Sequence, residues 1–368
     1  MITRGVTLPE IETLISSPGP FVSVYLNTEG NREQAAKEIS LRWRALRTEA
    51  EKRGAPKSDL EAIDDVVGNA QREGDGLVAF AAEGRIVHLD HLSTPVDDAI
   101  AFGHAPHLVP YLEWRQDNPT HIVALVDRTG AEIHVVSPWR PDWTGEVDGW
   151  EWPVTRVSPG GWSQRRLQQR AENLWDENAG QVAERLVAIA AQESAELVVL
   201  AGDVRAVGFL RKNLPERFEP VVHELGGTEA YSVDEIAEEV RKAVAAYAAQ
   251  NTERTLERFR EELGQDDLAV EGWDETFAAL REAKVDTLLV TRGPEDGRAV
   301  FAASDPRQAA VAEGTLSEMG FAGAVVAALA PDVAVRAALA GGSRILVIPS
   351  LSAEFTPKQG VGALLRFA

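Results

Sequence analysis

The 368-residue sequence predicts a mixed α/β (α+β) protein of three domains. Short apolar runs typical of strands are separated by longer stretches whose apolar residues recur at helical spacing. This alternation restarts near residues 117 and 228, and a chain of this length ordinarily forms two or three domains. We therefore expect domains at 1–116, 117–227 and 228–368.

The first domain is expected to combine helices with a small sheet. Residues 8–15 predict a short helix, and 21–26 alternate like a strand. Residues 77–89 predict a hairpin that turns at Glu83-Gly84. An amphipathic helix is expected over 35–53. Its basic residues are typical of a solvated face, but three of them also form a candidate RNA-binding surface: Arg42, Arg44 and Arg47.

The second domain begins again with strands. Residues 121–126 and 131–136 flank the four-residue connection Asp127–Gly130, which predicts a hairpin. A tryptophan-rich segment follows, for which packing is the favoured interpretation. A long helix is then expected from Gln164 to about Glu193, and two further strands at 197–201 and 220–223.

The third domain opens with a long acidic helix, expected at about 233–263. Ser232 with Glu235 three residues later predicts a capping box at its start. Further along, residues 273–283 predict a helix, and 287–291 and 345–348 predict strands.

Composition excludes several classes of protein. There is no cysteine, so disulfides, thiolate metal sites and cysteine nucleophiles are excluded. The sequence has neither a run of 18 apolar residues nor an apolar signal core at its start. We expect a monomeric cytoplasmic protein that does not enter a membrane. The net charge of −21 argues against non-specific coating of nucleic acid, so any RNA contact requires a local basic patch.

The most informative segment is a glycine-containing loop ahead of the long helix of the second domain. Pro159 and two glycines favour a loop there. An aromatic residue, a glutamine and several arginines follow, with no acid before Glu172, and this combination suits contact with RNA. The candidate RNA-binding residues of this segment are Gly160, Gly161, Trp162, Ser163, Gln164, Arg165, Arg166 and Arg170.

Other candidate sites are weaker. Asp127 and Asp203 each follow a strand, where carboxylates can hold magnesium, but turn aspartates that bond their own backbone are the favoured interpretation. Four histidines form two pairs at i, i+3 spacing: His88, His91, His104 and His107. The first pair begins in a strand and the second spans an irregular segment, so neither predicts a zinc site. No nucleotide-binding or nucleophile-elbow motif is present, and we expect no metal and no cofactor.

Two motifs near the end of the chain resemble a known family. Residues 273–280 followed by 283–290 resemble the opening of the third domain of archaeo-eukaryotic class-I peptide release factors, a family that includes Pelota. The terminal Gly-Val-Gly-Ala-Leu-Leu-Arg-Phe at 360–367 resembles the family's closing motif. The resemblance spans nearly the whole chain and is closest to the bacterial branch with its Balon-type ribosome hibernation factors.

The glycine loop resembles the Gly-Gly-Gln loop that release factors place in the peptidyl-transferase centre. Gly160 and Gly161 match its glycines, but Trp162 occupies the glutamine position, and Gln164 lies two residues later. The resemblance implies a central RNase H-like domain with an extended glycine loop. It also implies a C-terminal α/β/α domain like that of a ribosomal protein.

The resemblance implies a translation factor that occupies the A site of the 70S ribosome and contacts ribosomal RNA. Elongation factor Tu or another translational GTPase is the implied delivery partner, and the first domain would face the decoding centre. Because that domain carries no Asn-Ile-Lys-Ser motif, we do not expect stop-codon reading. Two alternatives remain open: a peptidyl-tRNA hydrolase with Gln164 as its catalytic residue, and an RNase H-like nuclease using Asp127.

Overall fold

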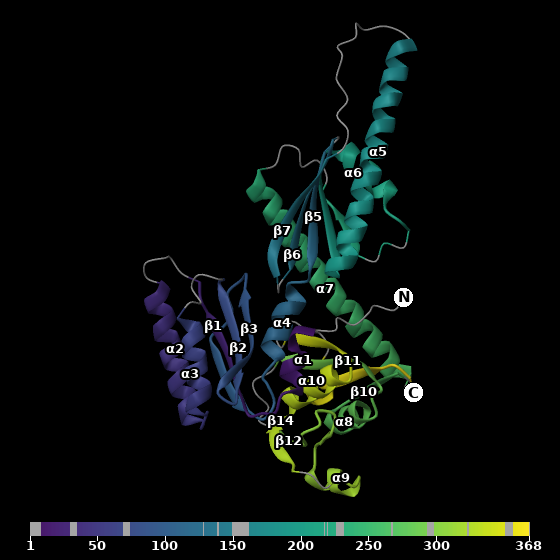
Figure 1. The fold of residues 1–368 in the computed structure, drawn as a ribbon. Helices are drawn as coiled ribbons and strands as arrows, with labels where there is room; N and C mark the ends of the chain where they lie inside the picture. Colours follow the sequence, from purple (N-terminus) through teal and green to yellow (C-terminus); the bar gives the residue numbers. More distant parts are fainter. Residues whose placement is uncertain are drawn as a thin grey trace. The chain divides into compact units, whose positions relative to one another are not determined.

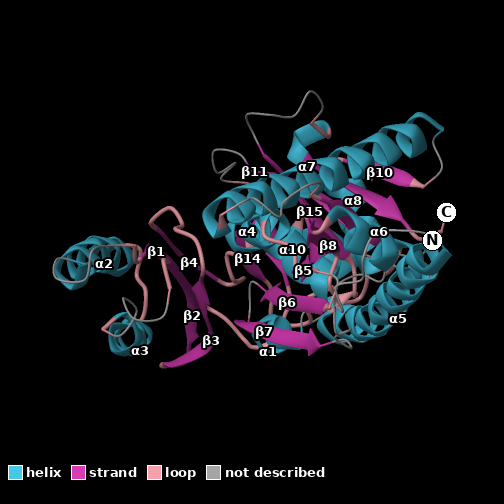
Figure 2. Cartoon of the chain, turned by 90° about the horizontal axis from the view of Figure 1, so that it is seen from above, coloured by secondary structure: helices cyan, strands magenta, loops and turns pink. Residues whose placement is uncertain are grey.

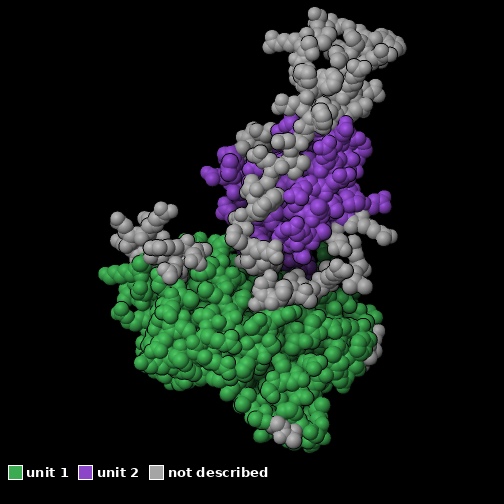
Figure 3. All heavy atoms as spheres, viewed as in Figure 1, with its two compact units in different colours: residues 1–116, 252–368 green, residues 117–251 purple. Residues whose placement is uncertain are grey.

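The protein forms two compact units in a computed structural model (Figure 3). One unit combines residues 1–116 with 252–368, and the other consists of 117–251. The structure describes residues 9–29, 35–68, 74–127, 129–137, 140–148, 162–216, 218, 220–225, 232–265, 268–292, 298–321, 324–349 and 356–367. Within these residues no helix is both long and apolar enough to cross a membrane.

The first 116 residues build a four-stranded antiparallel sheet in the order β3-β2-β1-β4. Its strands are β1 (Phe21–Asn27), β2 (Gly76–Ala82), β3 (Arg85–Leu92) and β4 (Ala99–Gly103). The hairpin between β2 and β3 turns at Glu83 and Gly84, which both have positive φ, of 54° and 75°. Two consecutive left-handed residues are the hallmark of a type I′ turn, so the predicted hairpin is confirmed.

Helices cover both faces of this sheet. They are α1 (Pro9–Ser16), α2 (Ala35–Lys52), α3 (Lys57–Val67) and α4 (Val109–Asp117). Because side chains alternate along a strand, Val22 and Val24 of β1 pack with α2 and α3, whereas Phe21 and Tyr25 pack on the opposite face with α1 and α4. Figure 2 shows α2 and α3 together beside one face of the sheet.

The last part of the chain forms a second sheet, in the order β10-β16-β11-β15. Its strands are β10 (Ala269–Glu271), β11 (Val285–Arg292), β15 (Arg344–Pro349) and β16 (Val361–Leu365). Leu288 and Val290 of β11 share a core with α8 (Trp273–Arg281) and α10 (Ala330–Ala340). Leu289, between them, packs with Phe259 of α7 (Val233–Gln265) on the other face. This is the α/β/α arrangement that the resemblance implies.

A smaller sheet lies between these elements in the sequence. It consists of β12 (Ala299–Ala302), β13 (Ala309–Ala310) and β14 (Val326–Leu329), in the order β13-β12-β14, and is accompanied by α9 (Glu313–Glu318). A 3-10 turn, η3 (Lys358–Gly360), leads into β16.

The two ends of the chain share one core and several polar contacts. Apolar residues of α1, α4 and β1 belong to the same buried cluster as those of α8, α10 and β11 (Figure 1). The Gln116 side chain donates to the Val347 carbonyl and accepts from the Val347 N–H, both at 3.0 Å. Glu113 binds Arg292 at 2.8 Å, and His107 contacts Asp332 at 2.8 Å. These contacts explain why residues 1–116 and 252–368 form one compact unit.

The middle unit contains a five-stranded sheet in the order β7-β6-β5-β8-β9. Its strands are β5 (His121–Val126), β6 (Gly130–Ser137), β7 (Arg140–Asp148), β8 (Leu197–Gly202) and β9 (Val221–Glu224). β6 pairs antiparallel with both β5 and β7, whereas β8 pairs parallel with both β5 and β9. Numbered within the unit the order is 3-2-1-4-5, which is the RNase H-like topology that the resemblance implies.

Helices cover both faces of the middle sheet. α5 (Trp162–Glu193) and α6 (Val204–Asn213) pack on one face, and the first part of α7 packs on the other. The predicted capping box is confirmed at the start of α7. The Ser232 N–H and hydroxyl both donate to Glu235 Oε2, and the Glu235 N–H donates back to the Ser232 hydroxyl. The mixed α/β fold class is therefore confirmed, and the division at 116/117 and 227/228 remains a prediction about domains.

Candidate functional site

The loop predicted to carry the function ends where α5 begins. Gly160 and Gly161 lie outside the described residues. Trp162 is the first residue of α5, so Gln164 belongs to the first turn of the helix. The remaining predicted residues of this segment also belong to the first turns: Ser163, Arg165, Arg166 and Arg170. Their side chains, like all those of residues 162–175, are outside the described part of the structure.

The carboxyl-terminal half of α5 anchors the helix to the sheet. Val182, Leu186 and Ile189 recur at helical spacing, are each at most 5% exposed, and belong to the core that includes β5, β6 and β8. A helix of 32 residues is about 48 Å long. The sequence therefore attaches the loop to a long helix that is fixed at its far end.

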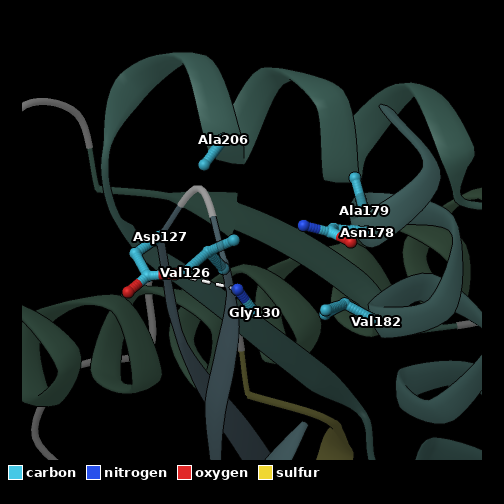
Figure 4. Close-up of a pocket in the computed structure, with 7 residues that line it drawn as sticks. All are labelled: Val126, Asp127, Gly130, Asn178, Ala179, Val182 and Ala206. Atoms are coloured by element: carbon cyan, nitrogen blue, oxygen red, sulfur yellow. Dashed lines mark hydrogen bonds between the residues drawn. The ribbon is translucent and has the colours of Figure 1, made fainter. Parts of the chain in front are cut away.

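A small pocket lies beside this anchored half of α5 (Figure 4). It encloses about 230 Å³ including its open mouth. It is lined by Val126, Asp127 and Gly130 at the turn between β5 and β6, by Asn178, Ala179 and Val182 of α5, and by Ala206 of α6. Sequence reasoning identified Asp127 here but missed Asn178. Asn178 is 3% exposed, and its neighbours in the sequence, Glu177 and Ala179, give no signal that it faces a pocket.

Asp127 holds the β5–β6 turn together. Its Oδ1 accepts hydrogen bonds from the Thr129 N–H at 2.7 Å, the Thr129 hydroxyl at 2.7 Å and the Gly130 N–H at 2.8 Å. Burial raises the pKa of Asp127, but these hydrogen bonds from Thr129 and Gly130 outweigh burial and hold the pKa below its ordinary value. The interpretation of Asp127 as a turn aspartate is therefore confirmed.

Asp203 has an equally local role. Its Oδ1 accepts from the N–H groups of Arg205 at 2.8 Å and Ala206 at 3.0 Å, which makes it the N-cap of α6. The preceding Gly202 has a φ of +122°, and a Cβ built there would lie 2.1 Å from the carbonyl oxygen of Val126. Only glycine permits this approach of β8 to β5, which also lets the Asp203 N–H donate to Val126.

The described residues do not assemble a metal site. No group of three or more His, Asp, Glu or Cys side chains among them is placed to hold a metal ion. Of the paired histidines, His107 contacts Asp332 and His88 lies within 6.0 Å of the Phe80 ring centre. Because Asp127 and Asp203 both stabilise local backbone, this geometry does not favour a nuclease.

The three predicted arginines of α2 differ in their surroundings. Arg42 donates to the carbonyl of Asn27 at 2.9 Å and lies 3.9 Å from both Glu38 and Asp98. Arg47 pairs with Glu51, and its Nε lies 3.3 Å from Asp64. By contrast, Arg44 is exposed and forms no ion pair with the described residues. Of these three arginines, Arg44 is the one best placed to contact a partner.

Comparison with known proteins identifies a family for the middle of the chain. Residues 120–265 match the sequence model of bacterial archaeo-eukaryotic release factor family 2. The match begins one residue before β5, ends with α7, and includes the whole of α5 with its Trp162-Ser163-Gln164-Arg165-Arg166 start.

Full-length relatives and solved structures give a wider likeness. The uncharacterised proteins Rv2629 and MT2704, from two strains of Mycobacterium tuberculosis, are each 28% identical, over 96% of this chain and 95% of theirs. The archaeal translation termination factor aRF1 is 18% identical, with 95% of this chain and 93% of that one covered and a TM-score of 0.23. Dom34 of S. cerevisiae, a translation termination-like factor, is 10% identical, with 70% and 64% covered and a TM-score of 0.38.

Proposed function

We propose that this chain, whose residues 120–265 match the sequence model of bacterial archaeo-eukaryotic release factor family 2, is a ribosome-associated translation factor. In this proposal it occupies the A site of vacant or stalled ribosomes and inserts residues 160–164 into the peptidyl-transferase centre. The observation that carries the proposal is the family match over 120–265, which contains both the glycine loop and the helix that bears it.

The charge distribution supports a local contact rather than a broad one. The chain carries a net charge of −21, so general attraction to RNA is unfavourable. The start of α5 nevertheless carries Arg165, Arg166 and Arg170 with no acidic residue among them. These arginines would neutralise ribosomal RNA phosphates, and Trp162 would stack on an exposed base, a contact worth about 1–3 kcal/mol. In the first domain, Arg44 would provide a second contact.

The helical start of α5 favours occupancy of the site over catalysis. In release factors of this family the resemblance places a glutamine where this chain has Trp162. Successive residues of an α-helix are about 100° apart, so positions 162 and 164 are separated by about 200° around the axis. Gln164 would take the place of Trp162 only if the first turn of α5 unwound. The peptidyl-tRNA hydrolase therefore remains the second candidate.

Co-sedimentation of the full chain with vacant 70S ribosomes tests the proposal. We expect binding that A-site tRNA displaces. The double variant Arg165→Glu/Arg166→Glu should weaken binding by at least about tenfold and flatten its salt dependence. The matched control is Arg241→Glu/Lys242→Glu on α7, an adjacent pair of exposed cations with the same charge change. Equal loss in both variants, or binding that tRNA does not displace, would contradict the proposal.

A release assay separates the two candidate functions. Ribosomes that carry peptidyl-tRNA in the P site are incubated with the wild type and with Gln164→Ala. Occupancy without catalysis predicts no ester hydrolysis by either protein and similar co-sedimentation of both. Hydrolysis by the wild type that Gln164→Ala abolishes would establish the hydrolase instead.

The family resemblance also implies a delivery partner. A translational GTPase such as elongation factor Tu would bring the protein to the ribosome. If so, adding that GTPase with GTP should increase the rate of ribosome binding.

A further inference from the structure

The helix that bears the glycine loop is held by α6 at the point where it leaves the body of its unit. Asn178 and Ala179 of α5 are buried, at 3% and 6% exposed. The amino-terminal part of α5 continues past α6 and past the strands of the sheet (Figure 1). At 1.5 Å per residue, the helix runs about 21 Å from Asp176 back to Trp162. Asp176 therefore lies at the base of a long projecting segment.

Two residues at the carboxyl end of α6 contact Asp176. The Asn213 Nδ2 donates to Asp176 Oδ1 at 2.9 Å, and the Lys212 Nζ lies 3.5 Å from the same oxygen. The Asn213 Nδ2 also donates to the Phe209 carbonyl at 2.9 Å. A side-chain amide has two N–H donors, so both donors of Asn213 are used. These two bonds fix the direction in which the Asn213 side chain meets Asp176.

α6 is itself attached to the sheet at both ends. Asp203 caps its start, and the Asp203 N–H donates to the Val126 carbonyl of β5 at 3.0 Å. Leu210, one turn before Asn213, is 0% exposed, and Leu214 after the helix is 8% exposed. Both leucines belong to the core that α5 and α6 share with the sheet. The sheet therefore sets the position of Asn213, and the bond to Asp176 ties α5 to that position.

A small tilt of α5 at its base displaces the start of the helix by several ångströms. Over a length of about 21 Å, a tilt of about 10° moves Trp162 by about 4 Å. Binding groups work when they are held within about 0.5 Å of their productive places. The apolar contacts of Val182, Leu186 and Ile189 lie further from the projecting segment than Asp176 does. A directed hydrogen bond at Asp176 therefore restricts the tilt where restriction has the greatest effect.

We propose that Asn213 is a positioning residue, whose bond to Asp176 holds the projecting part of α5 in one direction and so places residues 160–166 for their contact with the ribosome. This inference rests on the proposed function. If the bond is lost, only a fraction of the molecules has the loop in place, and the apparent affinity falls by that fraction. The Asp176 side chain is 40% exposed and Asn213 is exposed, so the bond adds little to the stability of the fold.

Distances between two spin labels test the direction of α5 without ribosomes. Because the chain has no cysteine, Gln168→Cys on α5 and Glu132→Cys on β6 provide two unique labelling sites. The distance distribution should become broader in Asn213→Ala and stay unchanged in Gln192→Ala. Gln192 is the matched control because its amide donates to the Glu193 carboxylate of the same helix, at 2.9 Å. An unchanged distribution in Asn213→Ala would overturn the proposal.

Co-sedimentation with 70S ribosomes tests the consequence for binding. Asn213→Ala should weaken binding by about three- to tenfold, with a change in Tm of less than about 3 °C, and Gln192→Ala should bind like the wild type. Asp176→Ala combined with Asn213→Ala should bind no more weakly than Asp176→Ala alone, because each change removes the same bond. The charge change is common to these two proteins and cancels in the comparison.

Additive losses of affinity, or an equal loss in Gln192→Ala, would overturn the positioning role of Asn213. A wild type that does not bind ribosomes would instead refute the proposed function. In that case the spin-label comparison still decides whether Asn213 holds the direction of α5, so the two failures are distinguishable.

Discussion

Glycine is required at position 362, in the closing Gly-Val-Gly motif, because its neighbours leave no room for a Cβ. A Cβ built at Gly362 would lie 2.6 Å from Cζ and 3.0 Å from Cε2 of Phe259, and 3.0 Å from the carbonyl oxygen of Val270. The Phe259 ring is 0% exposed and packs between α7 and the sheet that contains β16, so it has little room to move. We therefore predict that Gly362→Ala forces the ring or the strand to shift.

Overpacking of a well-filled core costs about 1–3 kcal/mol. For a folding unit of this size each kcal/mol lowers the Tm by about 2–4 °C, so Gly362→Ala should lower it by roughly 2–12 °C. Phe259→Leu is the compensating change, because it removes the atoms that clash. We expect the double variant to be more stable than the sum of the two single losses by about 1–2 kcal/mol. Thermal and urea unfolding followed by circular dichroism measure all four proteins.

The first glycine of the motif is the matched control. Gly360 has a φ of +75°, and a Cβ there would be 3.5 Å from Cβ of Thr291, an ordinary contact. Gly360→Ala should therefore cost about 1 kcal/mol through backbone conformation alone, and Phe259→Leu should not compensate for it. A Gly362→Ala protein as stable as the wild type, or additive losses with Phe259→Leu, would refute the steric explanation.

Three further predictions concern the middle unit and α2. Gly202→Ala should destabilise by about 3 kcal/mol or more, measured by urea unfolding, because its Cβ would meet the Val126 carbonyl oxygen at 2.1 Å and its φ is +122°. Since the folded-state pKa of Asp127 is below its ordinary value, the stabilisation by its carboxylate is present above the unfolded pKa, near 4, and is lost as pH falls through the folded pKa. Unfolding measured from pH 7 to pH 3 should therefore show a shallower loss of stability in Asp127→Asn, and parallel curves would contradict this assignment. Arg44→Glu should weaken ribosome binding about five- to tenfold with an unchanged Tm. Arg47→Gln should lower the Tm by about 2–4 °C and leave binding intact. The reverse pattern would contradict the assignment of Arg44 as the RNA contact.

Local sequence patterns predicted the elements whose cause is local. The Glu83-Gly84 turn, the Ser232–Glu235 capping box and the Asp127 turn each depend on residues at most three positions apart. The structure confirms all three. Several helices and strands were not predicted, among them α3, α4, α6, β4, β7 and β16. In α4 a proline at the second position interrupts the helical pattern of apolar residues. In β7 the tryptophan-rich composition indicates packing and does not show the alternation typical of a strand.

The sequence did not predict which side chains have internal partners, because those partners lie on distant segments of the chain. The basic helix α2 presents similar arginines, but Asp64 of α3 and Asp98 near β4 determine that Arg42 and Arg47 have internal partners. Likewise, Arg336 binds carbonyl groups of Ile15 and Ser17, which are more than 300 residues away in the chain. No periodicity within a single element contains this information, because the partner is selected by the packing of two elements.

The start of α5 bears on whether the protein only binds the ribosome or also hydrolyses peptidyl-tRNA. A glutamine that positions water must have a fixed place relative to the ester, and the match of Gly160-Gly161 gives that place to Trp162 in this chain. Because the helix begins at Trp162, the register of Gln164 is set by the helix, and moving it would break backbone hydrogen bonds of the first turn. An indole has no group that could activate water, but its flat apolar face stacks well on a base. Trp162 is therefore consistent with the proposed function, in which the loop occupies the peptidyl-transferase centre without catalysis. Under that proposal, Trp162→Gln should be the single change most able to produce ester hydrolysis in the release assay.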